Sequence, residues 1–339
     1  MFTKRIPRAA LLGGAAVAVA ATMAPSATTH AAAASSLPRN AIAMPTLYEV
    51  QAARAQLGDP TADCVLPIII GVTCVSAGQP MTYGGGPIQT APKVFIVFWG
   101  WNGRDPSGQA AYQERFFEGI GGGTWNASQT QYCDSTTLFG LRCNSGANLV
   151  GNPNPVFTTA NIWNDNTNAV PNQPDDAAIQ AEAARAASFF GTTSGNAQFV
   201  IDTPQGNSTS GFGTQWCAYH GITSGGLSYT DFPYISDAGG SCGENIVNSG
   251  SAGVNDGVSI VGGHEFAEAE TDPSPPNGWT DEIGAETGDK CAWITIGPGS
   301  VTDISLSTGS FAVQSLWSNN DNSGAGGCVT FYSGPGNQH

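Results

Sequence analysis

Apolar residues follow two different periods along the chain, and these periods predict the main elements. The continuous apolar run at 93–100 is typical of a strand buried on both faces. Apolar residues at helical spacing follow at 107–120, and an Ala-rich helix with acids in its first turn is predicted at 174–190. Another strand is predicted at 197–202. This order of strand, helix, helix and strand favours an α/β core.

The C-terminal half predicts shorter elements. Aromatic alternation indicates strands at 215–221 and 227–235, and closing strands are predicted at 290–296 and 310–316. A short helix is predicted at 45–55. The fold class that we expect is α/β or α+β, with a central mixed sheet flanked by helices, rich in loops and braced by disulfides.

One further helix, predicted between Val254 and Asp272, carries the most chemistry. Asp256 is its candidate N-cap, and the proline after Asp272 ends it because proline disfavours the α region for its predecessor. Two adjacent glycines, Gly262 and Gly263, are unfavourable in a helix. They therefore predict close packing against a neighbouring segment.

His264 and Glu268 lie one helical turn apart in the motif HEFAE, so they share a helix face and can bind one metal ion. Zinc peptidases use this spacing in H-E-x-x-H, and Glu268 takes the place of the second histidine. Glu265 projects beside that face, where it is a candidate general base that activates water. The alternative is a hydrogen-bonded core histidine beside solvated glutamates.

The loop after this helix is unusually acidic. From Glu265 to Asp289 there are eight acids, and no Lys or Arg occurs before Lys290. Like charges at this density repel unless a cation compensates them. Glu286 or Asp281 is the candidate third metal ligand. Zinc is the ion that we expect, and oxygen-rich coordination leaves calcium open.

Histidine is scarce, which draws attention to His220. Apart from His30 near the N-terminus and His339 at the end, the chain has only His220 and His264. One interpretation of His220 is a hydrogen bond in a tight glycine turn. The other is an active-site role facing His264, as a metal ligand or as an oxyanion stabiliser.

Other hydrolytic chemistries fit the sequence less well. The G-x-S-x-G match at 239–243 lacks the preceding strand and following helix of a nucleophile elbow, so it is interpreted as a glycine-rich turn. A serine triad assembled from distant positions stays open, because triads are recognised by geometry. A carboxylate pair among Asp272, Asp281 and Glu286 is also open, but it leaves His264 without a role.

The N-terminus predicts export. Three basic residues precede an apolar run and a small-residue stretch, which is typical of a secretory signal peptide at 1–34. No later stretch is long and apolar enough to cross a bilayer. Residues 35–87 are predicted to be an N-terminal extension or pro-segment, and 88–339 a single globular domain. We expect a secreted, extracellular protein that is free of the membrane after signal cleavage.

Charge and cysteine usage narrow the partners. Loss of the signal peptide would change the formal charge from −15 to −18, which argues against nucleic acid. We expect a monomer that acts on an extracellular peptide or protein. Eight cysteines in an exported chain favour disulfides, although eight permit many pairings. We predict nearest-neighbour pairs: Cys64 with Cys74, Cys133 with Cys143, Cys217 with Cys242, and Cys291 with Cys328.

Five segments between residues 87 and 329 form a recognisable series. They are the apolar strand at 94–99, W-N-x-S-x-x-Q-Y-C, W-C-A-Y-H-G, Y-I-S-D-A-G-G-S-C-G and D-G-V-S-I-V-G-G-H-E. Together they resemble the EXORDIUM or phosphate-induced protein family of plants and its bacterial relatives. The resemblance implies a secreted protein, and the plant members are linked to growth without an established catalytic activity. His264 and Glu265 depart from the plant pattern, so plant function does not transfer directly.

These observations lead to two hypotheses. The first is a secreted metal-dependent hydrolase, in its simplest form a zinc peptidase with ligands from His264, Glu268 and a downstream carboxylate. The second is a non-catalytic extracellular module that recognises cell wall or glycan and contains a structural metal or an acidic loop. A peptidase requires an open cleft beside Glu265, whereas a structural metal site is closed by protein ligands.

Overall fold

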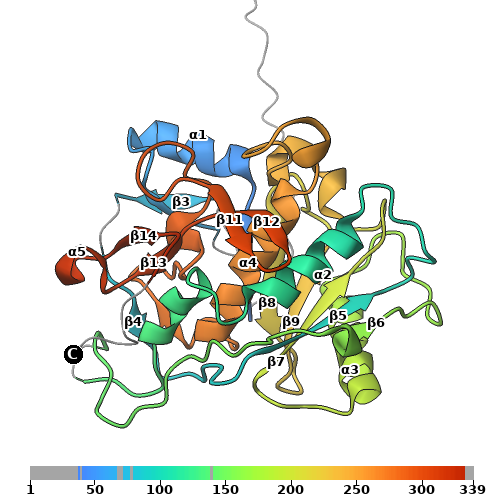
Figure 1. Cartoon of the computed structure of the whole chain (residues 1–339), viewed down its shortest axis with the longest axis horizontal. Coiled ribbons are helices and arrows are strands. Elements are labelled where there is room, and N and C mark those ends of the chain that lie inside the picture. Colours follow the sequence, from blue (N-terminus) through green and yellow to red (C-terminus); the bar gives the residue numbers. More distant parts are fainter. Residues whose placement is uncertain (1–36, 39, 67–71, 77–78, 138–139, 333–339) are drawn as a thin grey trace, which may run out of the picture. The chain divides into compact units, whose positions relative to one another are not determined.

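A mixed sheet of six strands forms the centre of the fold (Figure 1). The computed structural model describes residues 37–332 except 39, 67–71, 77–78 and 138–139, and these described residues belong to one compact unit. The strand order in the sheet is β1-β8-β9-β7-β5-β6. The fold class is α/β, as predicted, whereas the predicted signal peptide lies outside the described residues.

The sheet is parallel at one side and antiparallel at the other. Strands β6, β5, β7 and β9 run parallel to one another, and β8 and β1 add antiparallel pairings beside β9. Their bounds are β1 Ala41–Pro45, β5 Lys93–Phe98, β6 Ile162–Trp163, β7 Ala197–Asp202, β8 Trp216–Ile222 and β9 Ser228–Phe232. Strands β5, β7, β8 and β9 confirm the predicted strands, whereas β1 and β6 were not predicted.

Helices cover both faces of this sheet. The even-numbered residues of β5 pack with α2 (Gln109–Ile120) and α4 (Asp256–Thr271), and its odd-numbered residues pack with α3 (Asp176–Phe190). This alternation follows from the two-residue period of a strand. It explains why the run at 93–100 is continuously apolar: residues on both faces of β5 are buried. Figure 1 shows β5 between α2 and α3.

Every residue of α4 is buried, because the helix lies between the sheet and further elements. It packs against β8, α2 and β12 (Gly309–Val313). At Gly263 a Cβ atom would lie 3.0 Å from Trp125 and 3.2 Å from Phe116. The predicted close packing at this glycine is therefore confirmed.

The structure corrects the predicted N-cap of α4. Asn255 occupies the N-cap position, and Asp256 is the first helical residue. The Asp256 carboxylate instead accepts hydrogen bonds from the backbone N–H groups of Val247 (2.9 Å) and Asn248 (2.7 Å). These bonds tie the preceding loop to the helix. The helix ends at Thr271, as the following Asp-Pro pair predicts.

Smaller elements surround this core. The predicted helix at 45–55 is confirmed as α1 (Leu47–Leu57). Two-stranded sheets form from β2 with β3, β4 with β10, β11 with β12, and β13 with β14. The remaining bounds are β2 Asp63–Val65, β3 Thr73–Val75, β4 Thr82–Tyr83, β10 Trp279–Thr280, β11 Thr302–Leu306, β13 Leu316–Ser318, α5 Asp321–Gly324 and β14 Gly327–Val329.

The strand predicted at 290–296 is wrong. This segment enters from the 3-10 helix η6 (Asp289–Cys291) and continues as turns. Trp293 has φ of 54°, in the left-handed region that interrupts an extended strand. The strand predicted at 310–316 corresponds to β12 and the start of β13.

All four predicted disulfides are confirmed. The pair Cys291–Cys328 ties η6 to β14, and Cys217–Cys242 ties β8 to the 3-10 helix η4 (Gly239–Cys242). Four disulfides fit an oxidising extracellular environment. None of the described helices has the length and hydropathy needed to cross a bilayer.

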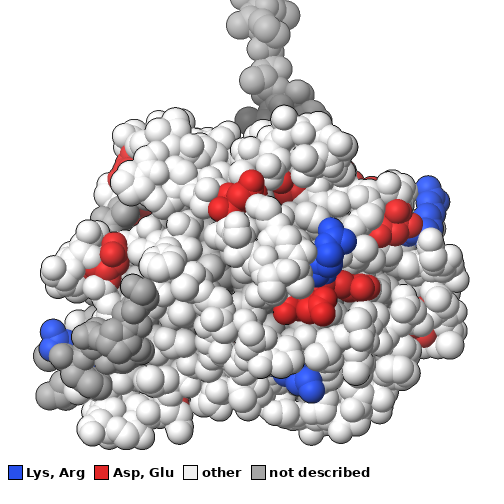
Figure 2. All heavy atoms as spheres, in the orientation of Figure 1, with Lys and Arg blue, Asp and Glu red and all other residues white. Residues whose placement is uncertain are grey.

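Acidic side chains are concentrated inside the molecule. Few charged side chains lie on the face drawn in Figure 2, although the formal charge of the chain is −15. The buried acids are Asp63, Asp165, Glu182, Asp202, Asp231, Asp256, Glu265, Glu268, Glu270, Asp272, Asp281, Glu286 and Asp289. Buried carboxylates require compensation, so this distribution directs attention to what neutralises them.

Candidate metal centre

Six of the buried polar residues converge on one region between the sheet, α4 and the loop after α4. Each side chain is only 0 % to 1 % exposed. They are His220 from β8, His264, Glu265 and Glu268 from α4, and Glu286 and Asp289 from the loop and η6. Three segments distant in sequence therefore supply one cluster of nitrogen and oxygen donors.

His264, Glu268 and Asp289 form the first group of possible ligands. The Nε2 atom of His264 lies 3.1 Å from Oε1 of Glu268 and 3.7 Å from Oδ1 of Asp289. The backbone N–H of Asp289 also donates to Oε1 of Glu268 at 2.9 Å. These three residues offer donor atoms within 4.8 Å of one another, so they can hold a metal ion.

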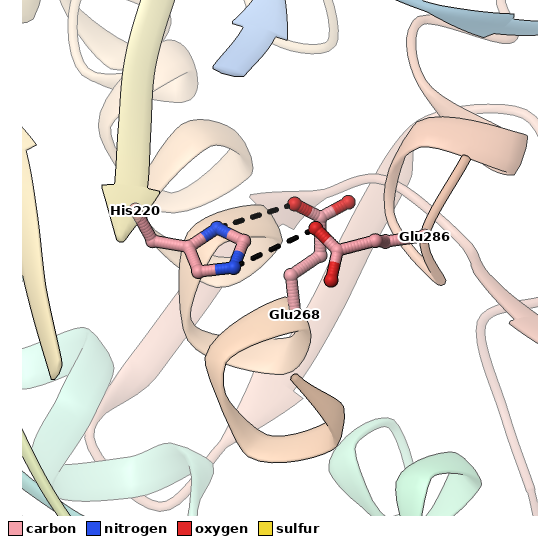
Figure 3. Close-up of side chains that lie close together, drawn as sticks. All are labelled: His220, Glu268 and Glu286. Atoms are coloured by element: carbon pink, nitrogen blue, oxygen red, sulfur yellow. Dashed lines mark ion pairs between the residues drawn. The ribbon is translucent and has the colours of Figure 1, made fainter. Parts of the chain in front are cut away.

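His220, Glu268 and Glu286 form the second group, and their side chains point toward one another in Figure 3. The Nδ1 atom of His220 lies 3.6 Å from Oε2 of Glu268, and its Nε2 atom lies 3.5 Å from Oε2 of Glu286. Glu265 completes this side, with Oε2 3.2 Å from Nδ1 of His220. Glu268 is common to both groups but turns a different oxygen to each.

A glutamine behind the first group fixes the orientation of His264. The Nε2 group of Gln314 donates to the Gly288 carbonyl at 2.8 Å, so its Oε1 atom faces Nδ1 of His264 at 3.2 Å. Nδ1–H of His264 can then donate to the glutamine. Nε2 of His264 then faces the carboxylates. A hydrogen bond at one ring nitrogen of a metal-binding histidine commonly leaves the other nitrogen for the metal in this way.

Several buried atoms of the cluster make no hydrogen bond in the described residues. Such atoms cost free energy when they are withdrawn from water without a partner. They are Nε2 of His264, Oε1 of Glu265, Oε2 of Glu268, both Oε atoms of Glu286 and Oδ1 of Asp289. A cation bound by either ligand group would give the atoms of that group a partner.

Neighbouring carboxylates shift the titration of both histidines. Burial alone would lower the pKa of His264, but the neighbouring carboxylates Glu268, Glu265 and Asp289 together outweigh burial and raise this pKa to about 10. Burial also lowers the pKa of His220, yet the carboxylates around it, Glu265 first among them, together outweigh burial and raise this pKa. In the absence of metal, protons therefore take the place of a cation beside the acids.

The carboxylates divide into two kinds. Burial raises the pKa of Glu265, Glu286 and Asp289, because their charged forms lose hydration. Glu268 differs: burial opposes its ionisation as well, but His264, His220 and the backbone N–H of Asp289 together outweigh burial and lower its pKa. Glu268 is therefore the carboxylate that stays ionised most readily and lies at the centre of the cluster.

The structure brings together five of the six site residues that the sequence indicated: His220, His264, Glu265, Glu268 and Glu286. It does not bring Asp281 to either group. Asp281 Oδ2 lies 2.8 Å from Nζ of Lys290, and its Oδ1 accepts the backbone N–H groups of Ile283 and Ala285. A cation from the chain itself already compensates this carboxylate, so Asp281 is not retained as a ligand.

Two members of the site were missed by sequence reasoning. Asp289 follows Glu286 by three residues, and this spacing within a helical turn was the available signal for a second inward acid. Gln314 carried no signal, because it lies in a segment that the sequence indicated only as a closing strand.

The serine alternative finds no support at the predicted motif. Ser241 lies in the 3-10 helix η4 (Gly239–Cys242), and its hydroxyl donates to the carbonyls of Gly213 and Ala238. The interpretation of this motif as a glycine-rich turn is confirmed. Both described histidines contact carboxylates, and their other partners are the Asp272 carbonyl and Gln314.

Comparisons of the chain with protein-family models, curated proteins and solved structures found no match. The resemblance to the EXORDIUM family therefore stays a prediction, and the functional proposal depends on the site itself.

Proposed function

We propose that this chain is an exported metal-dependent hydrolase, and that its centre acts on peptide bonds as a zinc peptidase does. The observation that carries the proposal is the convergence of two histidines and four carboxylates with buried donor atoms that make no hydrogen bond. A solvated acidic loop does not account for that convergence, because all six side chains are buried.

The donor set favours zinc over calcium. Calcium takes six to eight oxygen ligands, whereas zinc binds histidine nitrogen together with carboxylate oxygen. Each of the two ligand groups contains one histidine and two carboxylates. His264 and His220 are thus better suited to zinc or another divalent transition metal.

Glu265 is the proposed general base. Its Oε2 atom faces His220 at 3.2 Å, whereas its Oε1 atom makes no hydrogen bond. Burial raises the pKa of Glu265, which makes this carboxylate a better proton acceptor. A bound zinc ion would polarise the substrate carbonyl and acidify water. Glu265 would take a proton from the attacking water and transfer it to the leaving nitrogen as the C–N bond breaks.

The second candidate is a closed metal centre in a non-catalytic extracellular binding module. The observation that favours it is the burial of all six side chains, which are 0 % to 1 % exposed. Structural zinc sites are closed by protein ligands, and catalytic sites keep one position open to water or substrate. Both candidate functions therefore require a bound metal, and only the hydrolase also requires catalysis.

Glu265→Gln separates the two candidates. For the hydrolase, the purified variant should keep its metal content by elemental analysis and lose hydrolysis of casein or a peptide library. The wild-type activity should also disappear with a chelator and return with zinc. If the wild-type chain binds metal but does not hydrolyse peptides, the hydrolase is refuted and the closed metal centre is supported. If the chain binds no metal, both candidates are refuted.

Glu270→Gln is the matched control for this experiment. Glu270 is a buried glutamate of the same helix, but its Oε1 atom accepts a hydrogen bond from Asn126 at 3.0 Å and it belongs to neither ligand group. Burial raises the pKa of Glu270 well above its ordinary value, so glutamine resembles the protonated side chain that is already present. Metal content and hydrolysis should both survive this substitution.

A further inference from the structure

Glu268 turns its two carboxylate oxygens toward two different sets of donors. Oε1 lies 3.1 Å from Nε2 of His264, and Oε2 lies 3.6 Å from Nδ1 of His220. A carboxylate that serves one ion needs only one of these directions. The orientation of Glu268 thus resembles that of a bridging ligand.

The spacing of the donors suits one ion in the first group, and the second group brings three donor atoms within 4.8 Å of one another. Two donors at about 2.0–2.1 Å from a tetrahedral zinc ion lie about 3.3 Å from each other. In the first group the nitrogen to oxygen distances from His264 are 3.1 Å to Glu268 and 3.7 Å to Asp289. In the second group Nδ1 of His220 lies 3.6 Å from Glu268 and Nε2 lies 3.5 Å from Glu286, so an ion there binds only one of these nitrogens. One donor atom from each of these three residues still lies within 4.8 Å of the others.

The number of carboxylates in the cluster also favours two cations. The cluster contains four carboxylates, Glu265, Glu268, Glu286 and Asp289, and among the described residues none of them pairs with Lys or Arg. With neutral histidines, one divalent ion leaves two negative charges buried, whereas two divalent ions leave none. Because buried net charge is strongly unfavourable, a second ion would compensate the charge that a single ion leaves to bound protons.

We propose that the cluster holds two divalent cations bridged by Glu268. His264 and Asp289 bind one ion, and His220 and Glu286 bind the other. This inference rests on the proposed metal binding and deepens it, since paired ions about 3.5–4 Å apart are a common arrangement in metal-dependent hydrolases. Glu265 lies beside the second ion, at 3.2 Å from His220.

Manganese is a suitable probe because paired Mn(II) ions couple magnetically and a lone ion does not. The metal-free chain is loaded with Mn(II), and its content and electron paramagnetic resonance spectrum are measured. We expect two ions per chain with the spectrum of a coupled pair. One ion per chain with an uncoupled spectrum would overturn the bridged pair but leave the proposed hydrolase possible, and no bound ion would refute both.

Two single substitutions test the two halves separately. Asp289→Asn and Glu286→Gln should each lower the stoichiometry from two ions to one and replace the coupled spectrum with that of an isolated ion. Glu270→Gln should leave two coupled ions. If both ligand variants still bind two coupled ions, the assignment is wrong. If one of these variants does not fold, the other variant and the number of ions bound by the wild-type chain still test the bridged pair.

A different observation leads to a second inference, which concerns the N-terminal segment 40–65. Strand β1 of this segment is the edge strand of the sheet and pairs antiparallel with β8. In this pairing Ile42 lies opposite His220. The same segment also contacts the loop on the other side of the cluster: Asp63 pairs with Lys290, the residue after Asp289. The segment is therefore attached to both the strand and the loop that carry candidate ligands.

We infer that segment 40–65 covers the metal centre and keeps the proposed hydrolase latent. Without β1, the backbone edge of β8 beside His220 is unpaired. An unpaired edge accepts an extended polypeptide by strand addition, as β1 itself is accepted. The chemical class of substrate that fits this edge is thus an extended polypeptide. This inference rests on the proposed function and accounts for the burial of its site.

A recognition sequence for a site-specific protease, inserted after the exposed Ser76, tests the cover. The same sequence inserted after the exposed Thr193, beyond α3, is the control. Zinc-loaded chains are compared before and after cleavage by the rate at which a chromogenic chelator extracts zinc and by hydrolysis of casein. Cleavage after Ser76 should speed extraction at least about tenfold and start hydrolysis, and cleavage after Thr193 should change neither.

A synthetic peptide of residues 40–65 with Cys64→Ser provides the reverse test. Added to the cleaved chain, it should slow zinc extraction again and inhibit hydrolysis. Equal extraction rates before and after cleavage at Ser76 would overturn the covering role. Faster extraction without hydrolysis would support the cover and refute the proposed hydrolase, so the two failures differ.

Discussion

Gln314 shows how one residue outside the ligand set controls a ligand. The side-chain Nε2 group of Gln314 donates to the Gly288 carbonyl at 2.8 Å, and its Oε1 atom lies 3.2 Å from Nδ1 of His264. The sequence indicated His264 directly, because a histidine and a glutamate one helical turn apart are visible as a motif. It gave no access to Gln314, whose role depends on two long-range contacts.

We predict that Gln314→Ala weakens metal binding about 10- to 100-fold, the usual effect of losing a partner behind a metal-binding histidine. Without the acceptor, His264 can rotate or expose its other nitrogen to the carboxylates. Competition with a chelator of known affinity measures the change. Gln314→Glu keeps an acceptor oxygen and should recover most of the affinity. Unchanged affinity in the alanine variant would show that Gln314 does not orient the histidine.

Gly288 lies so close to two candidate ligands that no side chain fits there. A Cβ atom at this position would lie 2.6 Å from Nδ1 of His264 and 2.9 Å from Oε1 of Glu268. Its φ of −79° is open to any residue, so the restriction is one of space. We predict that Gly288→Ala destabilises the fold by about 1–3 kcal/mol and weakens metal binding. Chemical denaturation and metal titration measure the two effects.

Gly195→Ala is the control for this substitution. No atom lies within 4 Å of a Cβ built at Gly195, and the residue is exposed. Its stability should change by less than about 0.5 kcal/mol. Equal behaviour of the two alanine variants would mean that the loop at Gly288 shifts freely and does not constrain the cluster.

The acids of the loop after α4 show where prediction from sequence ends at the residue scale. Glu286 and Asp281 were equal candidates, and Asp289 was counted only as part of the charge. The loop has no periodicity that decides which acid faces inward. The structure decides it through Lys290, which pairs with Asp281, whereas Glu286 and Asp289 turn to the histidines.

At the scale of elements, long segments with one clear period were predictable and context-dependent segments were not. Helices α2, α3 and α4 and strands β5 and β7 lie where the sequence placed them, within about two residues at their ends. Strand β1 was missed because it is short and its pairing with β8 is set by tertiary contacts. The strand predicted at 290–296 failed because the segment turns at Trp293.

Removal of the metal should loosen the elements that the cluster joins. We predict that chelation increases hydrogen exchange in the last turns of α4 and in residues 286–291, because the carboxylates there then repel one another. Helix α3 lies on the other face of the sheet and should keep its protection. At a free metal concentration 1,000 times the dissociation constant, the loss of stability should be about 4 kcal/mol.

Exchange measured by mass spectrometry, with and without chelator, tests this prediction directly. Recovery of protection on addition of zinc is the required control, since it separates metal loss from other effects of the chelator. A uniform increase over α3, α4 and the loop would instead mean that the metal stabilises the whole fold without a local role.

At the scale of the whole molecule, many of the carboxylates lie in the interior and not on the surface. The sequence shows their number but not which of them are buried. Interior acids favour protons or cations. The proposed metal ions would compensate one set of them, and the ion pair of Lys290 with Asp63 and Asp281 compensates another. Asp231 belongs to neither set, and burial is the largest cause of its pKa shift.

Asp231 lies on β9, and its Oδ2 atom accepts a hydrogen bond from Thr209 at 2.5 Å. Burial raises its pKa from 3.8 to about 7. Because the folded chain holds this proton more tightly than the unfolded chain, the free energy of unfolding should fall as pH rises from about 4 to about 7. Asp231→Asn mimics the protonated carboxyl and should remove this loss, on the order of 4 kcal/mol at neutral pH.

Denaturant unfolding of the metal-free chain between pH 4 and pH 8 measures this effect as a difference between wild type and Asp231→Asn. Other buried acids contribute equally to both chains, so the difference isolates Asp231. The variant should be the more stable chain at pH 7, and the two curves should converge toward pH 4. The exposed Glu118→Gln variant should follow the wild-type curve throughout. If Asp231→Asn is instead less stable at pH 7, then the ionised carboxylate has a favourable partner in the fold and burial does not control its titration.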